Sequence, residues 1–318
     1  MEATPVASNS DETVSVVIPT YYRNDELDAA VESVFAQRYD PIEIVVVDDS
    51  GEAHAAPVVA DDDRVTYVPL EENRGPYAAR EIGIERSTGR YVQLLDDDDR
   101  LLPGKLEAQV PRLRSNSDVG VAYCGLRWED GPTVHPDPTV RGDVLEDALQ
   151  FSTSPAMMGT MLVERSVLEA LLPFPNRHGA DDIGLKIELA RQTDFDYVDE
   201  VLLVRGRSSN SVGTSWDAIE GRHEILSSYA NLYAEYPDAW RRALAETYLV
   251  SGQFRLNDRI WSPAAIADFA RALYHAPGLP PVYLGSLIAA LFGRGVYRRS
   301  RSLYSSIALG DERAGKTM

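Results

Sequence analysis

The sequence has little cysteine, little lysine and no apolar run long enough to cross a membrane. Its single cysteine, Cys124, excludes an internal disulfide and any zinc cluster of cysteines, which fits a reducing cytoplasmic setting. The formal net charge of −19 excludes a nucleic-acid-binding role, because phosphate binding needs a basic surface. The apolar run Val282–Phe292 is well short of the roughly 20 residues that a spanning helix needs.

Glycine-rich phosphate loops are also missing. No G-x-G-x-x-G turn follows the first expected strand, which excludes a dinucleotide-binding dehydrogenase. The loop after that strand reads PTYYRNDE and holds no glycine, which disfavours a sugar-phosphate nucleotidyltransferase. The five histidines show no metal-ligand spacing.

Lysine is scarce because only Lys105, Lys186 and Lys316 occur among 31 basic residues. An acidic, lysine-poor surface is typical of proteins that work in molar salt, where the screening length falls to roughly 3 Å and self-repulsion is weak. This composition predicts a halophilic source. An acidic mesophilic protein with GC-rich codon bias is the alternative.

The first 100 residues alternate strand and helix patterns. Short β-branched runs bounded by turn residues are typical of buried parallel strands, and apolar residues between them recur at helical spacing. Asn73 is the expected cap of the second helix. The expected strands are Val14–Pro19, Ile42–Val47, Val65–Pro69 and Tyr91–Leu95, and the expected helices are Asp25–Gln37 and Pro76–Ser87. This alternation predicts an α/β sheet with ligands at the carboxyl ends of its strands.

The later part of the chain changes from mixed to helical. We expect a helix at Lys105–Ser115 and strands at Val119–Trp128, Met157–Val163 and Val198–Val204. From about Ser215 the pattern is helical, with helices at Ala218–Tyr236, Ala239–Leu256 and Ala264–His275. Residues 1–12 are polar and acidic, without a signal-peptide pattern, and we expect a disordered tail there.

Four consecutive aspartates, Asp96–Asp99, follow the expected strand Tyr91–Leu95. Their mutual repulsion is costly unless a cation offsets it. Mg²⁺ and similar hard ions bind carboxylate oxygens and keep open positions for substrate phosphates. The run therefore indicates a metal site, with a solvated acidic turn as the alternative.

The stretch LLDDDDRLLPGKL resembles the Asp-x-Asp motif of family 2 glycosyltransferases, which have the GT-A fold. By this resemblance Asp96 would face the donor nucleoside or sugar, and Asp98 would be the principal ligand of Mg²⁺ or Mn²⁺. Asp97 fills the variable place of the motif.

Three further stretches resemble the same family in the same order. VSVVIPTYYR is similar to its first strand and loop, which implies that Pro19, Thr20 and Tyr21 lie beside the base. In IEIVVVDDS, Asp49 would accept a hydrogen bond from uracil N3–H. In NRGPYAAREIGI, Arg80 would meet the diphosphate or the base, next to a helix N-terminus.

The acceptor side has a weaker match. HGADDIGLKIELA resembles the Glu-Asp segment of the family, with Asp181 in the Glu place and Asp182 in the place of the general base. Both residues are alternatively caps of the first helical turn. The stretch RGRSSNS is similar to the family's Arg-x-His segment near the acceptor, with Arg207 where histidine is more usual. Its role is open between an acceptor contact and phosphate binding.

The resemblance implies a GT-A catalytic domain at residues 13–215, with a donor half at 13–103 and an acceptor half at 104–215, followed by a helical region at 216–318. It implies an inverting transferase that uses a UDP-sugar, or a GDP- or dTDP-sugar, with Mg²⁺ or Mn²⁺. The acceptor would be a lipid-linked glycan or a polysaccharide at the cytoplasmic membrane face. In a haloarchaeon this would be one step of N-glycan assembly on dolichyl phosphate. A non-catalytic nucleotide-sugar binder is the alternative.

The C-terminal region carries an apolar stripe of Leu284, Leu287, Ile288 and Leu291 at helical spacing, followed by several arginines. In so acidic a chain this combination indicates an interfacial helix on anionic lipid, and hence a peripheral membrane protein. The alternative is a helix that packs its stripe on the catalytic domain.

Overall fold

The computed structural model describes residues 12–59, 62–175, 179–206, 216–276, 278 and 281–299. The chain divides into two compact units. Unit 1 comprises residues 1–148, 152–176 and 182–211, and unit 2 comprises residues 149–151, 177–181 and 212–318.

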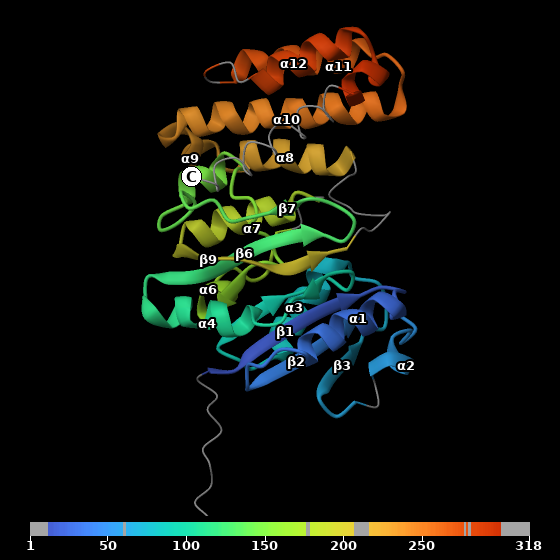
Figure 1. The fold of residues 1–318 in the computed structure, drawn as a ribbon, viewed down its shortest axis with the longest axis vertical. Coiled ribbons are helices and arrows are strands. Elements are labelled where there is room, and N and C mark those ends of the chain that lie inside the picture. The colour runs from blue at the N-terminus through green and yellow to red at the C-terminus, as the bar shows by residue number, and fades with distance from the viewer. Residues whose placement is uncertain are drawn as a thin grey trace, which may run out of the picture. The chain divides into compact units, whose positions relative to one another are not determined.

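Unit 1 is built on one mixed sheet with the strand order β3-β2-β1-β4-β8-β6-β9-β5, and β7 pairs with β6. The first four strands are parallel, β8 is antiparallel to both neighbours, and β6 and β9 are parallel. The strands are β1 (Val14–Thr20), β2 (Ile42–Asp48), β3 (Val65–Pro69), β4 (Tyr91–Leu94), β5 (Arg100–Leu101), β6 (Val119–Trp128), β7 (Thr133–Val134), β8 (Leu162–Glu164) and β9 (Asp194–Arg205). This is the predicted α/β sheet (Figure 1).

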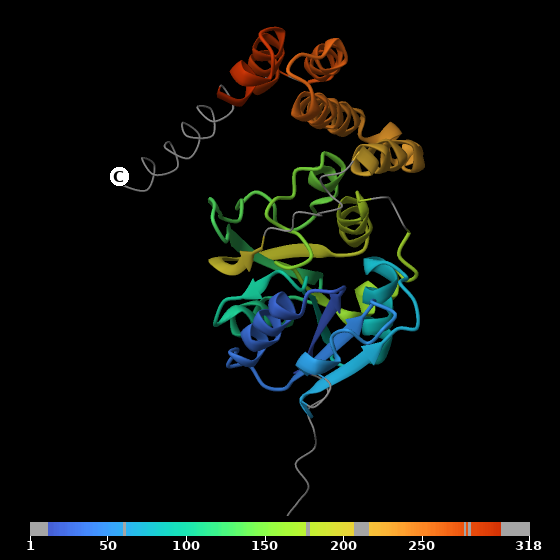
Figure 2. The same cartoon turned by 90° about the vertical axis from the view of Figure 1, so that its right-hand side faces the viewer.

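Helices cover both faces of the parallel strands because alternate side chains of each strand point to opposite sides. On one face, Val16 and Ile18 of β1 share a core with Leu27 of α1. On the other face, Val45 and Val47 of β2 pack against Ala79 of α3. Figure 2 shows the two helices on opposite sides of the sheet. The helices that lie wholly or mostly in unit 1 are α1 (Asn24–Phe35), α2 (Ala56–Val59), α3 (Pro76–Arg86), α4 (Lys105–Ser115), α5 (Leu145–Leu149), α6 (Arg165–Glu169) and α7 (Asp181–Ala190).

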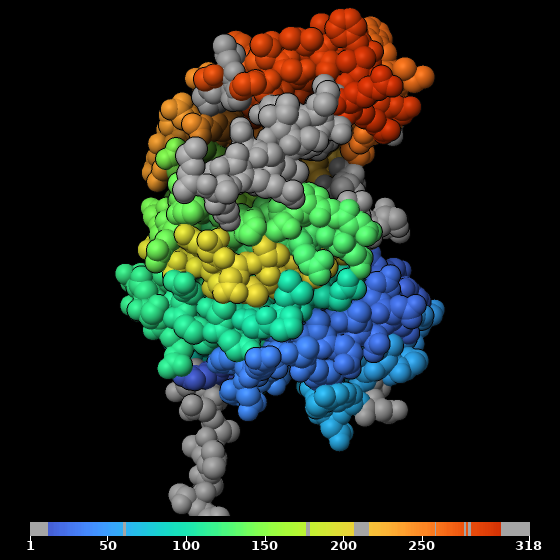
Figure 3. Space-filling model, in the orientation of Figure 1, coloured from blue at the N-terminus to red at the C-terminus, as the bar shows by residue number. Residues whose placement is uncertain are grey.

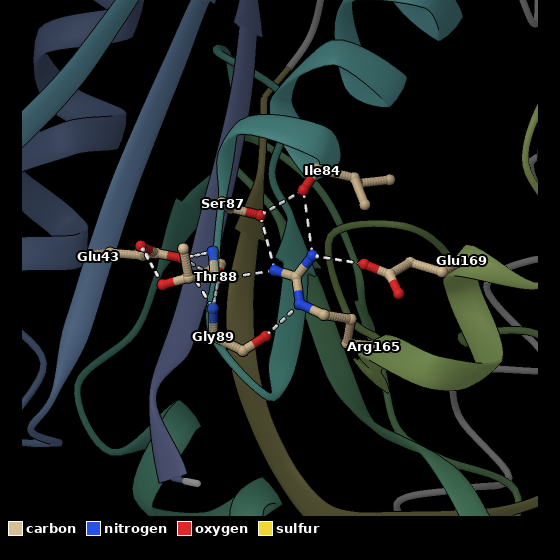
Figure 4. Close-up of polar contacts among 8 residues, drawn as sticks. Glu43, Ile84, Ser87, Thr88, Gly89, Arg165 and Glu169 are labelled. Carbon is tan, nitrogen blue, oxygen red and sulfur yellow. Dashed lines mark hydrogen bonds and ion pairs between the residues drawn. The ribbon is translucent and has the colours of Figure 1, made fainter. Parts of the chain in front are cut away.

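Arg165 binds the turn between α3 and β4 through several hydrogen bonds (Figure 4). Its guanidinium donates to the Ile84 carbonyl at 3.0 Å and to the Ser87 hydroxyl at 2.7 Å, and its Nε donates to the Gly89 carbonyl. Glu43 of β2 accepts from the same turn through the Gly89 N–H at 2.9 Å. The α3–β4 turn is thereby held to β2 and α6, at the sheet edge opposite the carboxyl ends of the parallel strands.

Lys105 of α4 is fully buried, and it has no carboxylate partner among the described residues. Its Nζ donates to Gln93 Oε1 and to Gln109 Oε1, the latter at 2.6 Å. Gln109 donates in turn to the Thr160 carbonyl at 2.8 Å, and Gln93 to the Gly159 carbonyl at 3.1 Å. Burial lowers the pKa of Lys105 to about 8. The network ties β4 to the loop before β8.

Unit 2 is helical, and its described helices are the orange-to-red atoms of the space-filling view (Figure 3). Phe269 and Ala272 of α11 lie in a core with Leu256 of α10 and Ala290 of α12. Asp268 is buried there and accepts from Ser251 at 2.8 Å and from Arg255 at 2.7 Å. The helices are α8 (Trp216–Ser228), α9 (Ala230–Glu235), α10 (Pro237–Asp258), α11 (Pro263–His275) and α12 (Pro281–Leu291). In the described part of the chain, no helix has the length and apolarity to span a bilayer.

Two local predictions were wrong. The expected strand Met157–Val163 is a strand only at Leu162–Glu164, because residues 157–160 form a turn in which the Thr160 N–H donates to the Met157 carbonyl at 3.0 Å. Asn73 does not cap α3: the N-cap is Gly75, with a φ of 85° that suits glycine.

Candidate active site

The acidic run lies where the carboxyl ends of three parallel strands meet. Thr20 at the end of β1 is paired with Asp48 at the end of β2, and the Leu95 N–H after β4 donates to the Val17 carbonyl at 3.0 Å. Asp96–Asp99 therefore follow directly from a buried central strand. The four carboxylates have different surroundings, so they differ in hydrogen-bond partners and in the direction in which the pKa of each is shifted.

Asp96 forms an ion pair with Arg80 of α3, whose side chain is almost fully buried. Burial opposes the charge of Asp96, but the Arg80 charge and hydrogen bond outweigh it and hold the pKa of Asp96 below its ordinary value. The two residues assigned to the donor from separate motifs are therefore direct partners in this structure.

Asp97 is fastened to the loop after β1. Its Oδ2 accepts from the Thr20 hydroxyl at 2.9 Å, and its Oδ1 accepts from Arg23 at 2.9 Å. Burial raises the pKa of Asp97 to about 6, against the charge of Arg23. The position that the motif leaves variable thus joins β4 to β1 in this chain.

Asp98 and Asp99 differ in exposure. The side chain of Asp98 is 19% exposed and lies 3.5 Å from Arg23, whereas Asp99 is buried and accepts from the Gly206 N–H at 3.0 Å. Burial and the charge of Asp96 raise the pKa of both, that of Asp99 well above its ordinary value. A β-carbon on Gly206 would lie 2.0 Å from the Asp98 carbonyl oxygen, so only glycine fits there.

The acidic run suits a hard divalent cation. The pKa of Asp98 and that of Asp99 are raised by burial and by the charge of Asp96, so a positive charge beside Asp98 would relieve both penalties. No group of three or more His, Cys, Asp or Glu side chains is arranged as a complete metal cage among the described residues. A hard ion can also bind through one or two protein carboxylates and complete its shell with phosphates and water.

The end of β2 provides two aspartates with different surroundings. Asp48 is buried and accepts from the Ala55 N–H at 2.7 Å and the Tyr67 hydroxyl at 2.8 Å, so it organises the following turn. Asp49 accepts from the N–H groups of Arg74 and Gly75, at 2.6 and 2.9 Å. Burial raises the pKa of Asp49. Each oxygen of Asp49 keeps a second lone pair for a ligand.

The loop after β1 presents two exposed tyrosines. Pro19 and Thr20 are the last residues of β1, and Tyr21 and Tyr22 follow with their rings 4.7 Å apart, edge to face. Tyr22 has a φ of 55°, which is strained for a residue with a side chain. Such aromatic surfaces at a strand end can stack on a planar base.

The two acceptor-side aspartates also differ. Asp181 is buried, and its Oδ2 accepts from the Gly179 N–H at 2.8 Å, which ties the start of α7 to the residues before it. Asp182 is half-buried: its Oδ2 lies 3.2 Å from Lys186, and its buried Oδ1 has no hydrogen-bond partner among the described residues. Of the two, Asp182 is the one that a substrate hydroxyl could reach, because its side chain is 37% exposed whereas Asp181 is buried. Arg207 lies outside the described residues.

Two arginines near the acidic run belong to motifs recognised in the sequence but were given no role there. Arg23 pairs with Asp97 and Asp98, and Arg205 of β9 lowers the pKa of Asp96, Asp98 and Asp99 through its charge. Arg205 stacks its guanidinium over the Trp128 ring, 4.6 Å from the centroid. Arg23 directly follows the tyrosines of the first motif, a position that could have drawn attention to it.

Comparisons with known proteins identify the family of this chain. The model of glycosyl transferase family 2 matches residues 15–172. TuaG of Bacillus subtilis, described as a putative teichuronic acid biosynthesis glycosyltransferase, is 35% identical over 217 residues, which cover 64% of this chain and 83% of TuaG. The chain belongs to glycosyltransferase family 2. The matched range of the family model ends before Asp182.

Solved structures show the same fold. TarS 1–349 of S. aureus aligns with a TM-score of 0.62 at 16% identity, covering 92% of this chain and 91% of that chain. The mannosyltransferase PcManGT of Pyrobaculum calidifontis, solved with GDP-Man and Mn²⁺, aligns with a TM-score of 0.60 at 23% identity, covering 96% and 87%. The predicted GT-A fold with a helical C-terminal region is confirmed.

Other relatives are longer proteins. An uncharacterized glycosyltransferase of Rickettsia felis is 28% identical over 199 residues, which are 60% of this chain and 32% of that protein.

Proposed function

We propose that this chain is an inverting glycosyltransferase that moves a sugar from a nucleotide-sugar, UDP-linked in the first instance, to a lipid-linked or polysaccharide acceptor. The observation that carries the proposal is that the four aspartates after β4 have different partners. Asp96, Asp97 and Asp99 accept close hydrogen bonds from Arg80, from Thr20 and Arg23, and from Gly206. Asp96 is more exposed than Asp98, at 38% against 19%, but it is paired with Arg80. Among the described side chains Asp98 has only the 3.5 Å contact with Arg23, which leaves its carboxylate open to a metal ion.

The donor would lie along the carboxyl ends of β1, β2 and β4. In this proposal Tyr21, with Pro19 and Thr20 behind it, flanks the base, and Asp49 accepts from the base N–H. Arg80 shares its charge between Asp96 and the diphosphate. Asp98 holds Mg²⁺ or Mn²⁺, which when bound neutralises negative charge on the departing diphosphate. The structures of TarS with UDP-GlcNAc and of PcManGT with GDP-Man and Mn²⁺ support this donor class.

On the acceptor side, Asp182 takes the proton of the attacking hydroxyl on its exposed carboxylate, and Lys186 lies 3.2 Å from its Oδ2. Asp181 positions the start of α7. TuaG is described as a putative teichuronic acid biosynthesis glycosyltransferase, and this supports a cell-surface glycan as product. If the acceptor is a polyprenyl or dolichyl phosphate, its oxygen is already anionic and Asp182 is not needed as a base.

The test is a panel of UDP-, GDP- and dTDP-sugars with a membrane lipid extract, assayed at low and at molar KCl, with and without chelator. We expect transfer from one donor that chelator abolishes and Mn²⁺ or Mg²⁺ restores. Asp98→Ala should lose transfer and Mn²⁺ binding, whereas the exposed control Asp63→Ala should retain both. Full transfer in chelator would refute the metal role, and donor binding without turnover on any acceptor would favour a non-catalytic binder.

A further inference from the structure

Helix α12 buries small residues and exposes large apolar ones, which is the reverse of the usual packing of a helix. Its buried residues are the small ones, Ser286, Ala289 and Ala290, which lie against α11. Its large apolar residues Leu284, Ile288 and Leu291 are about half exposed. Leu287 alone of the predicted stripe packs partly against the core of unit 2. A helix that only completed a core would bury its leucines and expose its small residues.

The junction between α10 and α11 extends this exposed apolar surface. Trp261 donates from its indole N–H to the Leu291 carbonyl at 3.3 Å, and the Arg294 N–H donates to the Ile260 carbonyl at 2.7 Å. Ile260 is 77% exposed and Phe292 is 71% exposed. We call the six exposed residues Ile260, Trp261, Leu284, Ile288, Leu291 and Phe292 the apolar face.

The charge around the apolar face is opposite to that of the whole chain. Residues 259–299 contain five arginines and one acidic residue, in a protein with a net charge of −19. The acidic residue, Asp268, is buried and paired with Arg255 and Arg271. Arg298 and Arg299 are exposed in the helical residues 294–299 that follow Phe292. The surface is therefore apolar and cationic together.

We propose that the apolar face of unit 2 inserts into the interface of an anionic lipid membrane, with Arg298 and Arg299 at the headgroups. Tryptophan, phenylalanine and leucine side by side with arginines are the composition of interfacial segments. Exposing such large apolar side chains together to water is unfavourable, so a patch of this kind usually marks an interaction site. Cationic side chains select anionic over neutral lipid. The proposal deepens the proposed function by placing the enzyme where a lipid-carried acceptor resides, but membrane binding does not require donor or metal.

The test is flotation of the full chain with vesicles of phosphatidylcholine alone and with about one third phosphatidylglycerol. We expect binding to the anionic vesicles. Phe292→Ser should weaken partitioning about tenfold, and Phe292→Leu should leave it nearly unchanged. Arg298→Glu should weaken it about fivefold or more at low salt, whereas Arg127→Glu, an exposed arginine of β6, should not. Circular dichroism checks that each variant is folded.

Salt separates the two contributions. Between about 0.1 M and 1 M NaCl the screening length falls from about 10 Å to 3 Å, so the preference for anionic vesicles should shrink while the effect of Phe292→Ser persists. Failure of the wild-type chain to float with any vesicle would overturn the proposal. So would a dimer by light scattering that Phe292→Ser dissociates, since the face would then be an interface between copies. Asp98→Ala should bind vesicles like wild type, so that loss of transfer and loss of membrane binding are read independently.

Discussion

The guanidinium of Arg23 lies 2.9 Å from the Asp97 carboxylate, measured from Nη1 to Oδ1. The same nitrogen is 3.5 Å from Asp98 Oδ2, the carboxylate proposed to hold the metal. Arg23 is fixed at the start of α1, where its carbonyl accepts from the Leu27 N–H at 2.9 Å. A side-chain cation thus already stands beside the carboxylate that a metal ion would use.

Arg23→Gln should raise the affinity for Mn²⁺ about fivefold or more. Removing a unit positive charge within about 4 Å of a ligand removes at least about 1 kcal/mol of repulsion between that charge and the metal. Manganese binding is measured by electron paramagnetic resonance without donor. Arg100→Gln, at an exposed arginine paired with Glu129, is the matched control. Unchanged or weaker Mn²⁺ binding in Arg23→Gln would show that Arg23 supports the metal site instead.

Gly206→Ala should disrupt the acidic run while leaving the protein folded. The added β-carbon would collide with the Asp98 carbonyl oxygen and displace the N–H that Asp99 accepts. We expect Mn²⁺ affinity and transfer to fall at least tenfold. Titration calorimetry measures the binding. Gly285→Ala in α12, where nothing lies near the new β-carbon, is the control. Normal metal binding in Gly206→Ala would mean that the loop adapts and that this contact is dispensable.

Asp182→Asn should reduce kcat by about 10² or more and leave donor affinity unchanged, because the amide no longer accepts the hydroxyl proton. Donor binding is followed by calorimetry and turnover by product release. Glu188→Gln, on the same helix and paired with Arg191, should behave as wild type. Loss of donor affinity in Asp182→Asn would assign this residue to the donor side. Full turnover would indicate an acceptor whose oxygen is already anionic.

Lys105 should make stability rise with pH between about 8 and 10.5. Its pKa is lowered to about 8 by burial, so in this window the unfolded chain holds a proton that the folded chain has released. Below pH 8 both states are protonated and the full cost of the buried charge remains. The unfolding free energy of wild type relative to Lys105→Met should increase by up to about 1.4 kcal/mol per pH unit. Urea unfolding at pH 7, 8, 9 and 10 measures it, and a constant difference would contradict the prediction.

Much of the donor half was predictable because it depends on local pattern. Buried β-branched strands end at the same sheet edge, so residues directly after β1, β2 and β4 had to lie together, and Thr20, Asp49 and the acidic run do. Contacts between distant residues were not predictable in this way. Gly206 meets Asp98 across more than one hundred positions, and no local signal marks that approach.

The sequence also could not decide which side of α12 packs. The spacing of its leucines indicates a stripe, but hydrophobic spacing alone does not say whether a core or a membrane receives it. The close approach of α11 selects small residues, and this is a property of the two helix surfaces together. Similarly, the motif assigns Asp97 no role because motif positions do not specify the contacts of a side chain, here those with Thr20 and Arg23.

The scarcity of lysine has a practical consequence for chemical labelling. Lys105 is shielded in the native fold, and Lys186 is largely covered and paired with Asp182. Lys316 lies outside the described residues. An amine-reactive reagent therefore finds, within the described part of the chain, one partly accessible lysine, and that lysine adjoins the proposed base. The rate at which Lys186 is modified would report whether an acceptor has drawn Asp182 away from it.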